Sequence, residues 1–311
     1  TLVGYLSWGG APSVEELFEE VVPPSEPAGA AEAGAAAEGA GAIEEAEGER
    51  YEVLVAVARP ERAARYARLA ALLGKLQDKD TRINVLNVTQ IPEQTPYETV
   101  TETSEARVRR IEDLLAEADL DADYAVGGHI CQDVAFDILQ TARDSGADLI
   151  LMGYPEEHTQ IAEKVEYKAP CGVLFASGFA DATDFEAVNI GAGGGPHHLA
   201  LLPIIERMGQ NGVGINVINV SPQGGGGRAE TPEATLAALS EAPEVHVQNV
   251  KAATVAEGLV DTAVENGGIL VIGATRTRRL RRWVFGSTPD RVINLADGAG
   301  VPVLVCAGSR G

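Results

Sequence analysis

Apolar and polar residues alternate along residues 51–180 in segments that predict strands and helices in turn. Strands are expected where short apolar runs occur, at residues 52–58, 82–88, 122–126, 147–153 and 172–177. Amphipathic helices are expected where apolar positions recur three and four residues apart, at residues 61–76, 102–118 and 133–144. Because apolar strands separated by helices are buried on both faces, the pattern predicts an α/β fold with a parallel sheet.

The same order of elements returns after residue 185. The pattern predicts strands at residues 187–192, 215–220, 244–250, 268–273 and 301–306, with helices at 196–208, 232–240, 254–265 and 289–296. Gly153 corresponds to Gly273 at an offset of 120 residues, whereas Val173 corresponds to Val303 at 130. The chain therefore contains an internal repeat, and the first copy is ten residues shorter between its last two strands.

Four segments follow from this pattern. Residues 1–22 hold an apolar and aromatic start and an amphipathic helical stretch, and residues 23–50 form a flexible acidic linker rich in Ala and Gly. Residues 51–180 and 185–311 form two tandem domains, each with an open parallel sheet.

The segment between the fourth strand and the last helix of the second domain has the features of an anion site. Gly273 ends the strand, Ser287 or Thr288 can cap the helix, and Pro289 suits its first turn. The first N–H groups of a helix have no intrahelical acceptor and attract anions. Glycines such as Gly273 and Gly286 allow the backbone to approach a phosphate closely.

The spacing of these residues resembles the nucleotide-binding signature of the universal stress protein family. That signature is a strand-final Gly, two residues, Gly, nine residues and then Gly-Ser or Gly-Thr. Here it reads Gly273, Arg276 and Gly286-Ser287. The resemblance extends over both repeats and implies two Rossmann-like domains of the adenine nucleotide alpha hydrolase type. It also implies ATP, ADP or AMP as ligand of the second domain, held at Gly273, Arg276, Gly286 and Ser287. The residues themselves add further candidate contacts: the helix start at Thr288, the loop arginines Arg278 and Arg279, and the strand-end glycines Gly191 and Gly193, which permit close approach.

Two departures from the signature distinguish the repeats. ATP-binding members carry an Asp after the first strand, whereas this chain has Ala58-Arg59-Pro60 in the first repeat and 191–193 (Gly-Ala-Gly) in the second. The first repeat also lacks the later glycines and places Glu156 and Glu157 where a phosphate would lie. We therefore expect no nucleotide in the first repeat and keep adenine specificity open in the second.

Basic residues are concentrated in the second loop. Five of the chain's 24 basic residues lie within seven positions: Arg276, Arg278, Arg279, Arg281 and Arg282. One interpretation is a clamp for phosphate or for a second subunit. A second is a solvated surface whose arginines pair with neighbouring acids. A third is a contact with an anionic lipid surface or with an acidic patch of a partner.

The overall charge excludes several classes of partner. A formal net charge of -22 repels nucleic acid and anionic membranes. The excess of acids with only five lysines is typical of a salt-adapted halophile, and an ordinary acidic protein is the alternative. Three widely spaced cysteines indicate free thiols in a reducing compartment, and no metal site is predicted because His197 and His198 are adjacent and diverge on a helix.

No nucleophile or acid–base constellation is visible, so we expect a regulatory or dimerisation module rather than an enzyme. Residues 1–10 (TLVGYLSWGG) are typical of the exit from a membrane helix. The tandem domains resemble the cytoplasmic C-terminal domains of prokaryotic, including haloarchaeal, cation-chloride cotransporters and amino-acid permeases.

That resemblance implies a transmembrane transporter domain in the same parent chain and a location at the cytoplasmic face of the membrane. Family members pair through edge strands, which implies a homodimer. The two repeats could also pair this way internally, which leaves homodimerisation open. The alternatives are a free-standing tandem universal stress protein and a structural dimerisation domain with vestigial sites.

Overall fold

The computed structural model describes residues 50–77, 79–91, 95–155, 159–179, 187–192, 208–222, 245–273 and 288–307. All of them belong to the compact unit Glu47–Gly311. The helical segment and linker predicted before residue 50 lie outside the described residues, as do nearly all of the helix predicted at 196–208 and the whole of the one predicted at 232–240.

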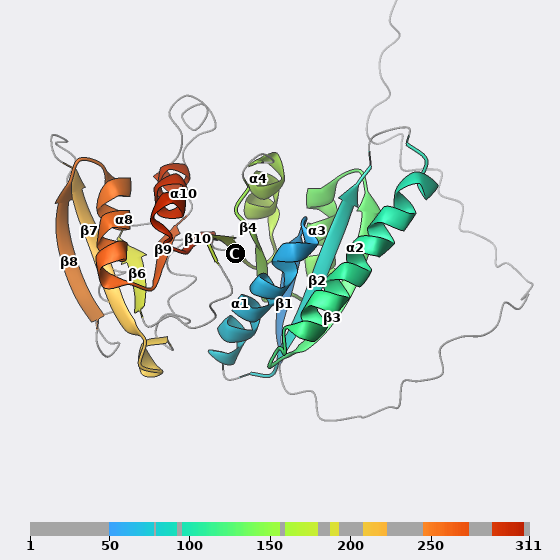
Figure 1. Cartoon of the computed structure of the whole chain (residues 1–311), viewed down its shortest axis with the longest axis horizontal. Helices are drawn as coiled ribbons and strands as arrows, with labels where there is room; N and C mark the ends of the chain where they lie inside the picture. The colour runs from blue at the N-terminus through green and yellow to red at the C-terminus, as the bar shows by residue number, and fades with distance from the viewer. Residues whose placement is uncertain are drawn as a thin grey trace, which may run out of the picture. The chain divides into compact units, whose positions relative to one another are not determined.

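Ten strands of the described residues form one sheet, in the order β3-β2-β1-β4-β5-β10-β9-β6-β7-β8 (Figure 1). Within each repeat, the neighbouring strands are parallel and follow the same relative order. The strands are β1 (Tyr51–Val57), β2 (Thr81–Gln90), β3 (Asp123–Cys131), β4 (Leu149–Gly153), β5 (Gly172–Ser177), β6 (Ala187–Gly191), β7 (Gly214–Pro222), β8 (Val245–Ala252), β9 (Ile269–Gly273) and β10 (Val303–Ala307). The predicted pair of open parallel α/β half-sheets is confirmed.

The two repeats join through their last strands. β5 and β10 are antiparallel, with Phe175 opposite Val305 and Leu174 opposite Cys306. Each repeat therefore covers the edge that the other would otherwise expose. The two repeats thus pair internally, a possibility that the sequence left open, and the expected homodimer stays a prediction.

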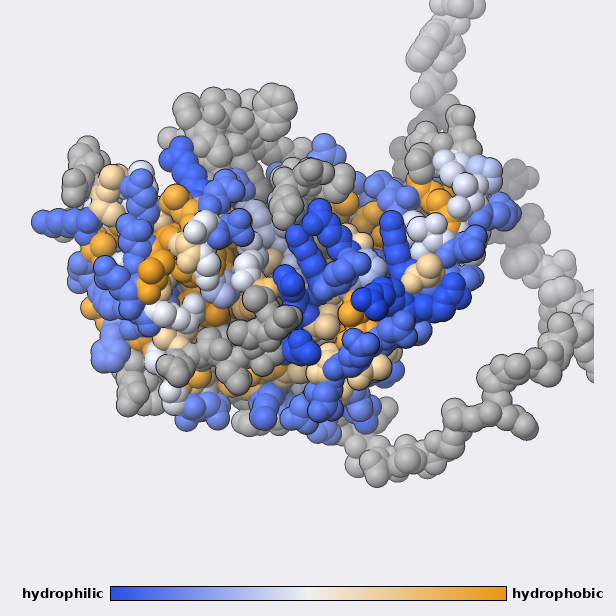
Figure 2. Space-filling view, in the orientation of Figure 1, coloured by the Kyte–Doolittle hydropathy of each residue, from blue (hydrophilic) through white to orange (hydrophobic). Residues whose placement is uncertain are grey.

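Helices cover both faces of the sheet. One core contains Val53, Val55 and Val57 with residues of α1 (Ala63–Lys75) and α2 (Glu98–Glu117), which lie in front of β1 and β2 in Figure 1. The other core contains Leu54 and Ala56 with residues of α3 (Val134–Asp144), α4 (Thr159–Lys168), α8 (Val255–Asn266) and α10 (Thr288–Ala299). Figure 2 shows hydrophilic residues gathered over the outward side of α2.

Local signals explain several helix boundaries. The predicted helix at 254–265 is α8, and Thr254 and Glu257 form a capping box at its start. Asp133 caps α3 by accepting a hydrogen bond from the Phe136 N–H at 3.2 Å. The predicted helix at 289–296 is α10, which begins at Thr288.

Two elements differ from the sequence-based expectation. α4 was not predicted, because only a few apolar positions, among them the buried Ala162 and Val165, pack it onto the sheet. β3 continues past residue 126 to Cys131, since its hydrogen-bonded pairing with β2 runs on through two glycines. At Gly128 a Cβ would lie 2.3 Å from the Val108 side chain, so the glycine allows α2 to pack closely on β3.

Candidate functional site

The carboxyl ends of β1 and β4 lie side by side at one edge of the sheet, with Ala56 opposite Met152. The chain leaves β1 toward β2 and β3 and returns to β4 on the other side of β1. Such a reversal of strand order opens a crevice at the carboxyl edge, where open α/β sheets bind ligands. In the second repeat, β6 and β9 form the equivalent point.

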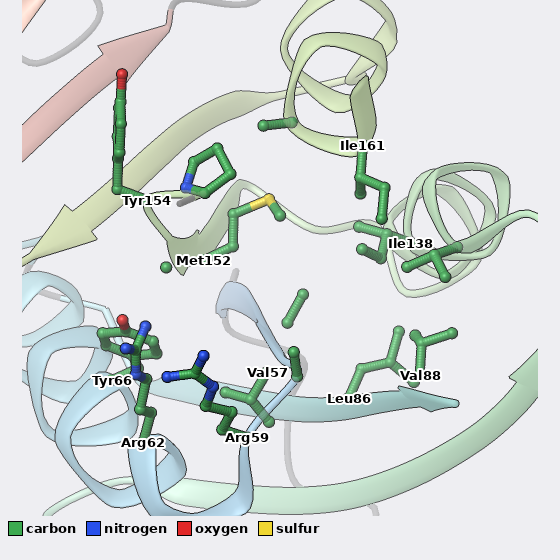
Figure 3. A pocket seen from close by; sticks show the side chains of 16 residues that line it. Val57, Arg59, Arg62, Tyr66, Leu86, Val88, Ile138, Met152, Tyr154 and Ile161 are labelled. Atoms are coloured by element: carbon green, nitrogen blue, oxygen red, sulfur yellow. The ribbon is translucent and has the colours of Figure 1, made fainter. Parts of the chain in front are cut away.

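A cavity of about 310 Å³ lies at this edge in the first repeat (Figure 3). This volume falls at the lower end of the roughly 300–1,000 Å³ typical of small-molecule sites. The lining residues come from β1, β2, β4, α1, α3, α4 and the segments that follow β1 and β4: Ala56, Val57, Ala58, Arg59, Arg62, Tyr66, Leu86, Val88, Val134, Ile138, Met152, Gly153, Tyr154, Pro155, Ile161 and Ala162. None of these described residues is acidic.

The cavity has a basic end and an apolar end. Figure 3 shows Arg59 and Arg62 beside Tyr66 at one end, and Val88 and Ile138 at the other. Arg59 has the extended backbone (φ -112°, ψ 119°) expected of a residue before proline, and the following 3-10 turn, η2 (Pro60–Arg62), leads into α1. A short, proline-directed connection after β1 thus brings two arginines to the mouth of the cavity.

Two tyrosine hydroxyls at the cavity donate hydrogen bonds to protein oxygens. The Tyr66 hydroxyl donates to the Ala176 carbonyl oxygen at 3.5 Å. The Tyr154 hydroxyl donates to the Asp290 carboxylate at 2.5 Å, and its ring packs edge-on against Phe175 with centroids 6.4 Å apart. Because Asp290 lies in the first turn of α10, Tyr154 links the cavity of the first repeat to a helix of the second.

Gly153, between Met152 and Tyr154, is required by close packing. A Cβ at this position would lie 2.8 Å from the Tyr66 hydroxyl oxygen. The glycine at the end of β4 therefore allows α1 and the β4 end to approach each other at the base of the cavity.

The structure describes three of the residues predicted to hold a nucleotide in the second repeat. Gly273 ends β9 and is half-buried, and Thr288 begins α10 and is exposed. Gly191 ends the neighbouring strand β6 and is buried; a Cβ there would lie 3.2 Å from the side chains of Leu259 and Ile272. Because β10 follows α10 and runs parallel to β9, α10 begins at the edge where β9 ends.

The other predicted residues lie outside the described part of the chain: Gly193, Arg276, Arg278, Arg279, Gly286 and Ser287, together with Arg281, Arg282, Glu156 and Glu157. No residue of the first repeat was predicted to bind a ligand. Arg59 was named only as part of the segment after the first strand that lacks an Asp. The sequence signal that could have indicated this cavity is Arg59 and Arg62 on either side of Pro60, directly after an apolar strand.

The thiols do not have the character of nucleophiles. Burial, followed by the charges of Asp137 and Asp133, raises the pKa of Cys131 to about 11, and burial raises that of Cys306 to about 12. His129, two residues before Cys131, lies 2.8 Å from the Asp137 carboxylate. At neutral pH a thiol with so high a pKa is almost entirely protonated.

Within the described ranges, no group of three or more His, Cys, Asp or Glu side chains is arranged to hold a metal ion. The helices in that part of the chain are also too short or too polar for any of them to span a membrane.

No protein-family model matches the chain, and no curated protein matches it. Among solved structures, a universal stress protein from Archaeoglobus fulgidus DSM 4304 matches with a TM-score of 0.61 and 17% identity, over 83% of this chain and 96% of that one. A putative universal stress protein from Pseudomonas aeruginosa UCBPP-PA14 matches with a TM-score of 0.43 and 15% identity, over 82% of this chain and 92% of that one. A universal stress protein from Archaeoglobus fulgidus in complex with dAMP covers 40% of this chain and 94% of its own, with a TM-score of 0.29 and 22% identity. The first of these matches, which spans both repeats, shows that the chain has the fold of a universal stress protein.

Proposed function

We propose that this chain is a non-catalytic regulatory module that binds an adenine nucleotide at its second repeat. The observation that carries the proposal is the position of Gly273 and Thr288. β9 ends at Gly273 beside the end of β6, and α10 begins at Thr288 on the same edge of the sheet. A phosphate at this edge would meet a helix N-terminus and a glycine that leaves room for it.

The intervening sequence adds positive charge. Residues 274–287 contain five arginines and end in Gly286-Ser287. Each charge-assisted hydrogen bond contributes roughly 1.5–3 kcal/mol, so two or three of them together with the helix N-terminus support an affinity of about micromolar once binding costs are deducted. Arginine can make bidentate contacts to phosphate, which compensates for the backbone freedom lost at Arg276.

We propose further that the module regulates a transmembrane transporter domain of the same parent chain at the cytoplasmic face of the membrane. The apolar and aromatic pattern of residues 1–10 supports this idea. The pairing of β5 with β10 supports a pseudo-dimer within one chain. A homodimer would then use other surfaces, because those two edges are already covered.

Calorimetric titration with ATP, ADP, AMP and cyclic di-AMP, in dilute buffer and in molar KCl, tests the nucleotide proposal. We expect at least one nucleotide to bind, and Gly286→Asp to abolish binding by placing a carboxylate next to the phosphate site. Gly298→Asp is the matched control, because Gly298 lies near the other end of α10 with open space around it.

Absence of binding by all four nucleotides in both buffers would refute the proposal and favour a structural domain with vestigial sites. Equal binding by Gly286→Asp and the unaltered chain would place the nucleotide elsewhere.

A further inference from the structure

We propose that the cavity of the first repeat is a separate site for a small anion with an apolar body, either a carboxylate or a phosphate ester. This site is independent of the nucleotide proposed for the second repeat. Its chemistry follows from three properties of the cavity: its charge, its apolar wall and the hydrogen bonds that its hydroxyl groups already make.

The charge of the described lining residues favours an anion, and Glu156 and Glu157, which follow Pro155, lie outside the described residues. Arg59 and Arg62 are the only described lining residues with a formal charge, and both come from the connection between β1 and α1. Figure 3 shows their guanidinium groups directed toward the space enclosed by the lining side chains. Two guanidinium groups suit the planar oxygens of a carboxylate or those of a phosphate.

The opposite wall favours an apolar body. Leu86, Val88, Ile138, Met152 and Ile161 line it, from β2, α3, β4 and α4. A methionine among branched aliphatic side chains can adapt to ligands of different shape. Apolar surface that a ligand buries here contributes roughly in proportion to its area, while the anion fixes its orientation.

The polar groups of the cavity are poorly suited to reading a purine base. The hydroxyls of Tyr66 and Tyr154 donate to Ala176 and Asp290, which are protein acceptors. Among the described lining residues, the remaining polar side chains are the two arginines. Such a site discriminates by charge and size rather than by the pattern of base donors and acceptors.

The chain's two methionines provide a direct test. Met152 lines the cavity, and Met208 is buried in the core of the second repeat. In NMR spectra of the full chain carrying ¹³C-methyl methionine, we expect hexanoate or hexyl phosphate to shift the Met152 signal saturably and to leave Met208 unchanged. Whichever of hexanoate and hexyl phosphate binds more tightly identifies the anionic group that the cavity prefers. Hexanamide, which has the same apolar body without charge, should bind at least about tenfold more weakly.

The double variant Arg59→Gln/Arg62→Gln should weaken anion binding at least about tenfold. Arg82→Gln, an exposed arginine on β2, is the matched control and should bind as the unaltered chain does. If the double variant loses its far-UV circular dichroism, Arg59→Gln alone serves, because Arg59 is exposed.

Four results would overturn the proposal. They are an unshifted Met152 signal with both anions, equal affinity for hexanamide, unchanged affinity in the arginine variants, and a Met152 shift by AMP that requires the same arginines. Gly286→Asp should leave the hexanoate or hexyl phosphate response intact, so failure of the nucleotide site and failure of this site are separable.

Discussion

Asn189 is the center of a polar network in the described part of the second repeat. It is fully buried on β6, where its amide nitrogen donates to the carbonyl oxygens of Gly267 at 2.7 Å and Ile269 at 3.2 Å. Its side-chain oxygen accepts from Asn266 at 2.8 Å and Asn216 at 3.2 Å. We predict that Asn189→Leu destabilises the protein markedly.

The magnitude follows from these four hydrogen bonds. A typical intramolecular hydrogen bond contributes about 0.5–1.5 kcal/mol net, and a buried acceptor left without a donor costs about 1–3 kcal/mol. The leucine side chain offsets part of this loss of stability by burying apolar surface. We therefore expect the free energy of unfolding to fall by roughly 3 kcal/mol.

Urea denaturation followed by far-UV circular dichroism measures this loss, with an unchanged slope against urea as the sign that only stability has altered. The control is Asn84→Leu, because Asn84 occupies the same position opposite Leu54 that Asn216 occupies opposite Asn189. Asn84 is half-buried and donates to Glu52 at 3.1 Å, so its loss should cost less than about 1 kcal/mol. A loss for Asn189→Leu that does not exceed the control would refute the reasoning.

Three further predictions concern single positions. Gly268→Ala should lower the free energy of unfolding by more than about 2 kcal/mol, because φ is +80° and the new Cβ would lie 1.9 Å from a β6 carbonyl oxygen. Gly298→Ala, in open space on α10, should raise the free energy of unfolding by about 0.5–1 kcal/mol. Urea denaturation of both variants measures the difference. Tyr154→Phe removes the hydrogen bond to Asp290 and should cost about 1 kcal/mol in thermal unfolding; no change would mean that this contact does not hold the repeats together. Cys131, whose pKa is raised to about 11, should be alkylated slowly by iodoacetamide at pH 8 and faster as the pH rises toward 11, as followed by mass spectrometry. Because the pKa of Cys131 is higher in the folded protein than in the unfolded chain, its contribution to stability is lost as the pH rises toward 11. Alkylation at pH 8 at the rate of an unfolded peptide would contradict the raised pKa.

The sequence was sufficient to predict most of the strands and their repetition along the chain. Val53, Leu54 and Val55 form an apolar run because a strand of a covered parallel sheet is buried on both faces, and all three side chains are fully buried. The apolar periodicity at residues 254–265 predicted α8, and the capping box of Thr254 and Glu257 at its start is a local interaction that the structure shows. α4 was missed because its stability comes from packing rather than from a strong periodic pattern.

The sequence by itself therefore determined two tandem α/β repeats and the spacing of a loop that resembles a phosphate site. Only the tertiary structure decided that β5 pairs antiparallel with β10, because edge pairing depends on contacts between residues far apart in the chain. The cavity of the first repeat was also decided at that level. It is a space left between α1, α3, α4 and the ends of three strands, and no single segment encodes its volume or brings Arg59 and Arg62 opposite an apolar wall.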